Sequence, residues 1–316
     1  MELSIVIPVY NSEKTLAPLV ERLQHCLAGR PFEVILVNDG SRDRSEAVCR
    51  QLTRQWSNVQ FIGLRRNFGE FNAVLCGLNY VRGRYAVLID DDFQNPPEAI
   101  LTLVEAAETG DYDVVYSRYD RKQHHWFRNL GSRLVNALAT NLLGKPRDLY
   151  LSSFKLIRYE VVREIIRYTG PYPYIDGLIF RVTRQVGSVA VPHHARSAGA
   201  SNYTAKKLIS LFLNVVIGYS VWPLRICTLT GAGLFGLSTL LGLALLVGVG
   251  LGWLEPAGWQ VVGVLIGFGV GLQLLFMGIL SEYLGKLFMM QSGLPPYVVK
   301  TELRQPDRAD VRSEPA

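Results

Sequence analysis

The chain has 316 residues, of which 49% are hydrophobic, and a formal net charge of +6 at pH 7. This length suffices for one sizeable α/β domain together with a second part. The four cysteines, Cys26, Cys49, Cys76 and Cys227, have neither the spacing of a metal site nor the density of a disulfide framework. The composition therefore excludes a small disulfide-stapled module and a cysteine-based zinc site, and free thiols are expected.

The first part of the chain alternates between short β-branched runs and stretches with the apolar spacing of helices. The expected strands are Leu3–Val9, Phe32–Val37 and Val59–Leu64, and the expected helices are Glu13–Leu27, Arg44–Gln55 and Phe71–Val81. The N-terminal run has no basic start and no long apolar core, so it predicts a strand and not a signal peptide. Successive strand-helix-strand units imply parallel pairing with right-handed crossovers. The sequence thus predicts a doubly wound, mostly parallel sheet with helices on both faces.

An apolar run, Tyr85–Ile89, ends abruptly in the carboxylates of Asp90, Asp91 and Asp92. It reads as a strand buried on both faces, and open α/β sheets bind ligands at the carboxyl ends of such strands. Alternate residues Asp90 and Asp92 can converge on one ion there, and Gln94 offers a neutral oxygen, as hard cations require. The pattern predicts a site for Mg2+ or Mn2+; the alternative is an acidic surface turn.

Two long stretches near the C-terminus, 226–254 and 256–281, contain no Asp, Glu, Lys or Arg. Each exceeds the roughly 20 residues needed to cross a bilayer. Basic residues flank the pair on its outer ends, whereas the intervening turn carries only Glu255. The charge bias predicts a hairpin, with spans at about 226–252 and 257–281 and both termini in the cytoplasm.

The remaining boundaries follow from polarity. The stretch from Trp126 to Leu143 is too polar to span a membrane, yet apolar enough on one face to lie in its interface. A second amphipathic helix, led by Lys206 and Lys207, would lie against anionic headgroups. The expected parts are a cytosolic domain at 1–204, with an interface helix at about 125–143, an amphipathic helix at 205–222, the hairpin at 223–290 and a cytosolic tail at 291–316.

Several motifs, in order and spacing, resemble those of family 2 inverting glycosyltransferases. The segments IVIPVYN, VNDGS and DDDFQNPPE resemble their nucleotide-sugar-binding half, which has the GT-A fold. The later segments SRY, WFR, HHARSAGASNY, PLR and SEYLGK extend the resemblance to about Val299. Together with the two spans, the ordered set is similar to the polyprenyl-phosphate glycosyltransferases, the group that contains dolichyl-phosphate mannose synthase and bacterial undecaprenyl-phosphate sugar transferases.

This resemblance implies a donor site at the predicted strand ends. Its metal positions match Asp90, Asp92 and Gln94, which makes Asp90 and Asp92 the expected catalytic carboxylates. Its nucleoside contacts match Pro8, Tyr10 and Asp39, and Asp91 is grouped with these donor-binding residues. Simple turn chemistry at Asp39 and Gly40 is the alternative. The family often has Ala where this chain has Asp91. It also often has Glu where this chain has Ser12, so the donor contact that this Glu would make is left open.

The resemblance also implies an acceptor site. Arg118, Arg128 and Ser132 match the family's phosphate-binding set, and Arg128 is also counted as catalytic; an ordinary solvated basic face is the alternative. Arg196 and Ser201 match a loop that closes over the donor diphosphate, although Asn202 replaces its usual lysine.

One position departs from the family in a way that bears on mechanism. Ser153 stands where many relatives have an Asp that is a candidate base, and Asp176 is the nearest other carboxylate, with a structural role as the alternative. A polyprenyl phosphate is largely ionised already, so its oxygen can attack without a base.

The expected function is inverting transfer of one sugar from a nucleotide donor, UDP-linked, to undecaprenyl phosphate at the cytoplasmic face of a bacterial-type inner membrane. The expected partners are the nucleotide sugar, the polyprenyl phosphate and the lipid bilayer, with no nucleic acid, and a homo-oligomer is left open. Two alternatives are kept: a processive polysaccharide synthase, which should have more spans and a Gln-x-x-Arg-Trp segment, and a non-catalytic membrane partner that binds nucleotide sugar or lipid. No motif identifies the sugar.

Overall fold

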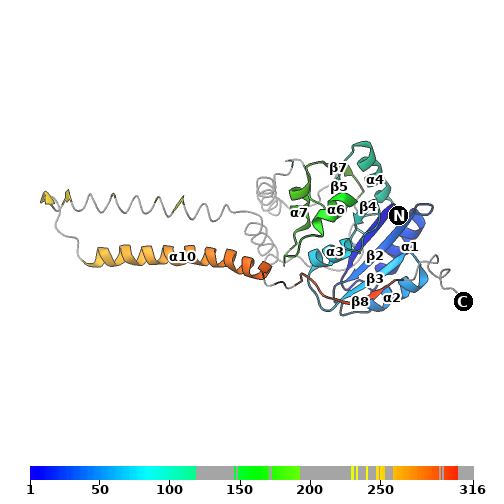
Figure 1. Ribbon diagram of the computed structural model, residues 1–316, viewed down its shortest axis with the longest axis horizontal. Helices are drawn as coiled ribbons and strands as arrows, with labels where there is room; N and C mark the ends of the chain where they lie inside the picture. The colour runs from blue at the N-terminus through cyan, green and yellow to red at the C-terminus, as the bar shows by residue number, and fades with distance from the viewer. Residues whose placement is uncertain are drawn as a thin grey trace. The chain divides into compact units, whose positions relative to one another are not determined.

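A computed structural model (Figure 1) describes residues 1–118, 146, 149–170, 173–192, 229–230, 233, 240, 247–248, 250–252, 259–291, 293 and 295–304. Its strands are β1 (Leu3–Val9), β2 (Phe32–Asn38), β3 (Val59–Leu64), β4 (Tyr85–Leu88), β5 (Val114–Arg118), β6 (Lys155–Arg158), β7 (Val186–Ala190) and β8 (Val299–Leu303). Its helices are α1 (Leu16–Cys26), α2 (Ser45–Gln55), α3 (Glu70–Leu78), α4 (Ala99–Thr109), α6 (Tyr159–Ile165), α7 (Ile175–Val182) and α10 (Trp259–Gln291).

Within the described residues the strands form one eight-stranded sheet, in the order β7-β5-β6-β4-β1-β2-β3-β8. Strands β4, β1, β2 and β3 pair in parallel, and β6 is antiparallel to both β4 and β5. The predicted α/β fold with a mostly parallel sheet is therefore confirmed. Parallel neighbours end at the same edge, so the loops after β1, β2 and β4 come together there.

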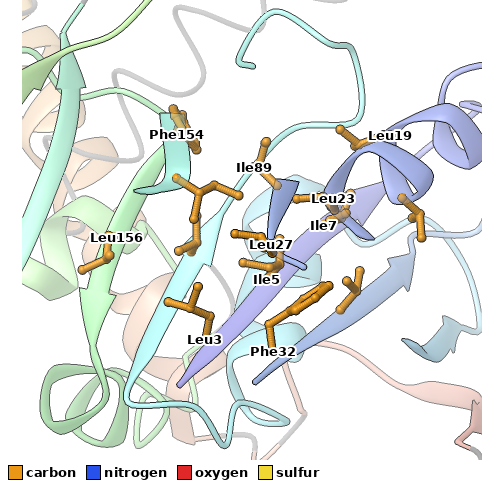
Figure 2. Close-up of a cluster of buried hydrophobic side chains, with 14 of the residues drawn as sticks. Leu3, Ile5, Ile7, Leu19, Leu23, Leu27, Phe32, Ile89, Phe154 and Leu156 are labelled. Atoms are coloured by element: carbon orange, nitrogen blue, oxygen red, sulfur yellow. The ribbon is translucent and has the colours of Figure 1, made fainter. Parts of the chain in front are cut away.

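The core lies between the sheet and α1 (Figure 2). Leu16, Leu19, Val20 and Leu23 are fully buried, at the i, i+3, i+4, i+7 spacing of one helix face. They belong to the same apolar cluster as Leu3, Ile5 and Ile7 of β1, Ile89, Phe154 and Leu156. All of β4, and all of β1 except the partly buried Pro8, is buried, so the carboxylates that follow β4 are anchored to the core of the sheet.

Strand β8, in the C-terminal segment, extends the sheet, although the sequence predicted no strand there. The sequence analysis treats 291–316 as a tail, whereas Val299–Leu303 pairs antiparallel with β3 and becomes the edge strand. Two further contacts hold this segment: Arg65 N–H donates to the Val298 carbonyl at 2.9 Å, and the Tyr80 hydroxyl to Glu302 at 3.1 Å. The chain thus returns to the sheet after α10.

The chain divides into two compact units, Met1–Thr204 with Gly293–Ala316, and Ala205–Ser292. The second unit contains α10, 33 residues long. Among the helices of the described residues, none meets both the length and the apolarity that a bilayer crossing requires. The first predicted span, at about 226–252, falls largely outside the described residues, as do the predicted interface helices at about 125–143 and 205–222.

Candidate active site

Three loops at one edge of the sheet carry the predicted donor residues. Pro8 is in β1 and Tyr10 directly follows it, Asp39 directly follows β2, and Asp90 to Asp92 follow β4. Hydrogen bonds join the loop after β1 to the loop after β2 and to the start of α2: Arg42 N–H donates to the Asn11 side chain at 2.8 Å, and Ser12 N–H to the Ser45 hydroxyl at 2.8 Å. Tyr10 is 37% exposed, so its ring is open to a ligand.

The predicted metal residues Asp90, Asp92 and Gln94 are all partly exposed in the loop after β4. Asp90 accepts a hydrogen bond from the Ser153 hydroxyl at 2.6 Å, and Asp92 from the Gln94 backbone N–H at 3.1 Å. Phe93, between them, has φ of 59°, an unusual conformation for a non-glycine residue that often marks functional loops. No group of three or more His, Cys, Asp or Glu side chains in the described part of the chain forms a ready metal site.

Crowded negative charge nevertheless makes this edge suitable for a divalent cation. Burial, and then the neighbouring charges of Asp90 and Asp92, raise the pKa of Asp91 to about 6, although the Ser12 hydroxyl opposes the shift. The repulsion between these carboxylates is what a bound cation would relieve. A six-coordinate ion needs more oxygens than two carboxylates provide, so the residues fit a metal whose other ligands are substrate phosphate and water.

Asp91 has a different neighbourhood from Asp90 and Asp92. Its carboxylate accepts a hydrogen bond from the Ser12 hydroxyl, in the loop after β1. The sequence departs from the family at both positions, with Ser12 for Glu and Asp91 for Ala. This hydrogen bond joins the loop after β1 to the loop after β4.

Replacing Asp91 with asparagine should stabilise the metal-free protein at pH 7 more than at pH 4. The pKa of Asp91 is raised from an ordinary value near 4 to about 6, so its ionised form opposes folding increasingly as pH rises through that window. A shift of this size corresponds to about 3 kcal/mol. Thermal unfolding in EDTA at both pH values tests this, with Glu105→Gln on α4 as the control; a stability difference that does not change with pH would contradict it.

Asp39 has a structural partner as well as a predicted ligand. Its buried carboxylate accepts hydrogen bonds from the backbone N–H groups of Phe68, at 2.7 Å, and Gly69, at 2.9 Å. Desolvation raises its pKa, and these two bonds oppose the shift. A Cβ on Gly40, which has φ of 62°, would lie 2.6 Å from the backbone of Arg66, so only glycine allows this approach. Asp39 therefore positions the loop before α3, and contact with a nucleoside stays a prediction.

A cavity of about 200 Å³ opens beside Asp90. Its walls come from β1, the N-terminal turn of α3, the end of β4, the segment before β6, and the start of α7. Glu70 and Phe71 contribute from α3, and Ser153 and Lys155 from the β6 side. The segments 70–74, 151–155 and 174–176 are far apart in sequence, so the fold is what assembles this cavity.

A buried charge pair forms one wall of the cavity. Lys155 and Asp176 are 3% and 7% exposed and form an ion pair, and the Tyr116 hydroxyl donates to Asp176 at 2.9 Å. Asp176 is thus committed to buried partners, which favours the structural alternative over a base. Ser153 instead faces Asp90 through the hydrogen bond described above.

Glu70 is the site residue that the sequence analysis missed most clearly. Glu70 is an exposed residue at the start of α3, and it lines the cavity, where protein atoms surround its carboxylate. Desolvation by the surrounding protein, and then the charge of Asp90, raise its pKa to about 7, against the effect of Lys155. Acidic residues are common in the first turn of helices, so the sequence alone does not indicate that Glu70 belongs to a site.

The remaining predicted residues divide into two groups. Arg118 is the exposed last residue of β5. Arg128, Ser132, Arg196 and Ser201 lie outside the described residues.

Solved structures of the same fold define the class of this domain. A crystal structure of glucosyl-3-phosphoglycerate synthase from Mycobacterium tuberculosis, in complex with Mn2+, uridine-diphosphate-glucose and phosphoglyceric acid, matches with a TM-score of 0.52 and 20% sequence identity, over 68% of this chain and 77% of that chain. The domain therefore has the GT-A-like α/β fold.

Residues 4–166 match the model of glycosyl transferase family 2, and the chain belongs to this family. Its curated relatives include undecaprenyl-phosphate 4-deoxy-4-formamido-L-arabinose transferase of Edwardsiella ictaluri (strain 93-146), 34% identical over 96% of this chain and 95% of the relative. The protein of the same name from Pseudomonas aeruginosa (strain LESB58) is 36% identical over 95% of this chain and 90% of the relative. The resemblance to polyprenyl-phosphate glycosyltransferases is thus confirmed, and the chain is an enzyme of the glycosyltransferase class.

Proposed function

We propose that this enzyme transfers one sugar from a nucleotide sugar, UDP-linked, to undecaprenyl phosphate by single displacement with inversion. The observation that carries the proposal is similarity along nearly the whole chain to relatives named as undecaprenyl-phosphate sugar transferases. The aspartates after β4, beside a cavity at the ligand-binding edge of the sheet, support it.

On the donor side, Asp90, Asp92 and Gln94 would hold Mg2+ or Mn2+ together with the donor diphosphate. Such an ion, when bound, neutralises charge that develops on the leaving diphosphate. Tyr10 packs on the nucleoside, and the Arg196 and Ser201 loop closes over the diphosphate. These residues orient the donor and stabilise charge, so positioning and electrostatics carry the reaction.

On the acceptor side, Arg118, Arg128 and Ser132 bind the phosphate of the lipid. The acceptor oxygen is already ionised near neutral pH, so the enzyme needs no base at Ser153. The Ser153 hydroxyl is instead placed to hold Asp90 in orientation, at 2.6 Å.

Membrane attachment is assigned to residues 223–290. We infer a hairpin with spans at about 226–252 and 257–281, in a bacterial inner membrane, with the catalytic domain and both termini cytoplasmic. The charge-free stretches of the sequence support this. Apolar side chains along α10, including Ile266, Leu284 and Phe288, are exposed by 55% or more, which suits contact with lipid or with a further copy of the chain.

Product analysis tests the proposed function. Purified protein is incubated with a panel of nucleotide sugars and a short polyprenyl phosphate, and the lipid products are weighed by mass spectrometry. A polyprenyl-monophosphate sugar is expected, and its formation should stop in EDTA. Absence of any such product across UDP- and GDP-linked donors would refute the proposal.

Replacing Arg128 with alanine should impair acceptor use and spare donor binding. A charge-assisted hydrogen bond to phosphate contributes about 1.5–3 kcal/mol, so kcat/KM for the lipid should fall by about 10- to 150-fold. Steady-state kinetics with varied lipid, and calorimetry of donor binding without lipid, measure the two effects. Arg163→Ala, at an exposed arginine of α6, is the control. Equal loss of donor binding would reassign Arg128 to the donor diphosphate.

A further inference from the structure

The cavity beside Asp90 is suited to select the sugar of the donor, an inference that rests on the proposed function. Its volume of about 200 Å³ is below the roughly 300–1,000 Å³ of sites for drug-sized ligands. This size suits a single sugar ring and leaves no space for a nucleotide as well. Because the cavity shares Asp90 with the predicted metal residues, a ring inside it would lie beside the bond that is broken.

The walls combine apolar and polar groups in the way that small-molecule sites do. Phe71 and Tyr174 pack edge to face, with ring centroids 5.6 Å apart, and both line the cavity. They provide an apolar surface for the C–H groups of a sugar ring. The other polar groups of the lining are three carboxylates, two serine hydroxyls and one ammonium.

The charges of these walls are unequal. The one ammonium, on Lys155, is already engaged by Asp176, so it offers little attraction to an incoming anion. Asp90 accepts from Ser153. Glu70, in contrast, makes no hydrogen bond or ion pair with another side chain in the described part of the chain, although it lines the cavity. Above its pKa of about 7 the Glu70 carboxylate is ionised, and it then attracts hydroxyl or amino groups and repels a carboxylate.

The geometry points to Glu70 as a specificity-determining residue that accepts a hydrogen bond from a hydroxyl or amino group of the donor sugar. The cavity accordingly takes neutral or amino sugars and rejects uronic acids, whose ring carboxylate would face Glu70. This selection acts on the sugar ring alone, so the nucleotide should bind equally well whichever residue occupies position 70.

The test uses the full-length protein and two matched donor pairs, UDP-glucose with UDP-glucuronate and GDP-mannose with GDP-mannuronate. Calorimetry at pH 8, where Glu70 is mainly ionised, gives Kd for each donor and for free UDP and GDP, in the wild type, Glu70→Gln and the control Glu105→Gln. The wild type should bind the neutral sugar of the preferred nucleotide at least about tenfold more tightly than its uronate. Glu70→Gln should reduce this ratio about tenfold or more, with Kd for the free nucleotide unchanged.

Three results would overturn the inference: no preference for the neutral sugar in the wild type, the same preference in Glu70→Gln, or weaker binding of free nucleotide in Glu70→Gln. The last result would place Glu70 at the diphosphate. Glutamine keeps the size of the side chain at an exposed position, and an unchanged melting temperature confirms that the variant is folded. Because these outcomes are read from binding, they stay separate from the proposed function, which fails only if no donor yields a polyprenyl-linked sugar.

Discussion

Replacing Asp92 with alanine should lower kcat for sugar transfer by at least about a hundredfold while the protein stays folded. The side chain is partly exposed in the loop after β4, so its removal leaves the buried strand and the core intact. One of two acidic ligands would be lost from the cation, and an electrostatic group of this kind contributes about 3–4 kcal/mol to transition-state stabilisation. Turnover with excess Mg2+ or Mn2+, together with calorimetry of metal-dependent donor binding, measures the loss.

The adjacent Asp91→Ala is the comparison variant, because Asp91 accepts a hydrogen bond from Ser12 and is not one of the predicted metal ligands. It should keep most of the turnover that Asp92→Ala loses. Undiminished transfer by the wild type in EDTA would refute metal dependence altogether. Equal losses in the two variants would show that total negative charge matters here, and not the ligand position.

Replacing Lys155 with methionine should lower the free energy of unfolding by about 3–5 kcal/mol, because it leaves the buried carboxylate of Asp176 without its counter-ion. The loss comes from one uncompensated charge, and it should therefore be smaller when Asp176 is replaced as well. The double variant Lys155→Met, Asp176→Leu is expected to be more stable than Lys155→Met alone. Denaturant unfolding of Lys155→Met, Asp176→Leu and the double variant measures this coupling.

Lys300→Met, at an exposed lysine of β8, is the control and should change stability by less than about 0.5 kcal/mol. Additive losses from the Lys155 and Asp176 replacements would contradict the account, because independent residues have no counter-ion to lose. The hydroxyl of Tyr116 also donates to Asp176, so Tyr116→Phe in the wild type should lower the free energy of unfolding by a smaller amount, about 1 kcal/mol.

The sequence predicted the strands of the first half well, because β-branched runs flanked by turn residues have few alternatives. Leu3–Val9 and Val59–Leu64 are strands with the predicted bounds. Helix starts were less accurate: α1 begins at Leu16 and not at Glu13, since Thr15 and Leu16 N–H both donate to the Ser12 carbonyl and form a turn first. The strand-end carboxylates could be predicted because parallel neighbours must end at one edge.

Contacts between distant segments could not be predicted in the same way. The sequence indicated Asp176 alone, and only the packing of α7 on the sheet pairs it with the buried Lys155. Ser12 and Asp91 each appeared as a departure from the family, and only the structure shows that they are hydrogen-bonded to each other. No sequence pattern indicated Glu70, because residues that line a cavity come from separate segments and have no regular spacing in the sequence.

Strand β8 also sets an order of events during biosynthesis. Chains emerge from the ribosome N-terminus first, and domains generally fold in that order. Residues 299–303 are made only after residues 205–292, so β3 has an unpaired edge for the whole time that the helical unit is being synthesised. An unpaired edge is a site for wrong strand pairing. The catalytic sheet of a newly made chain can therefore be completed only after its helical unit has left the ribosome.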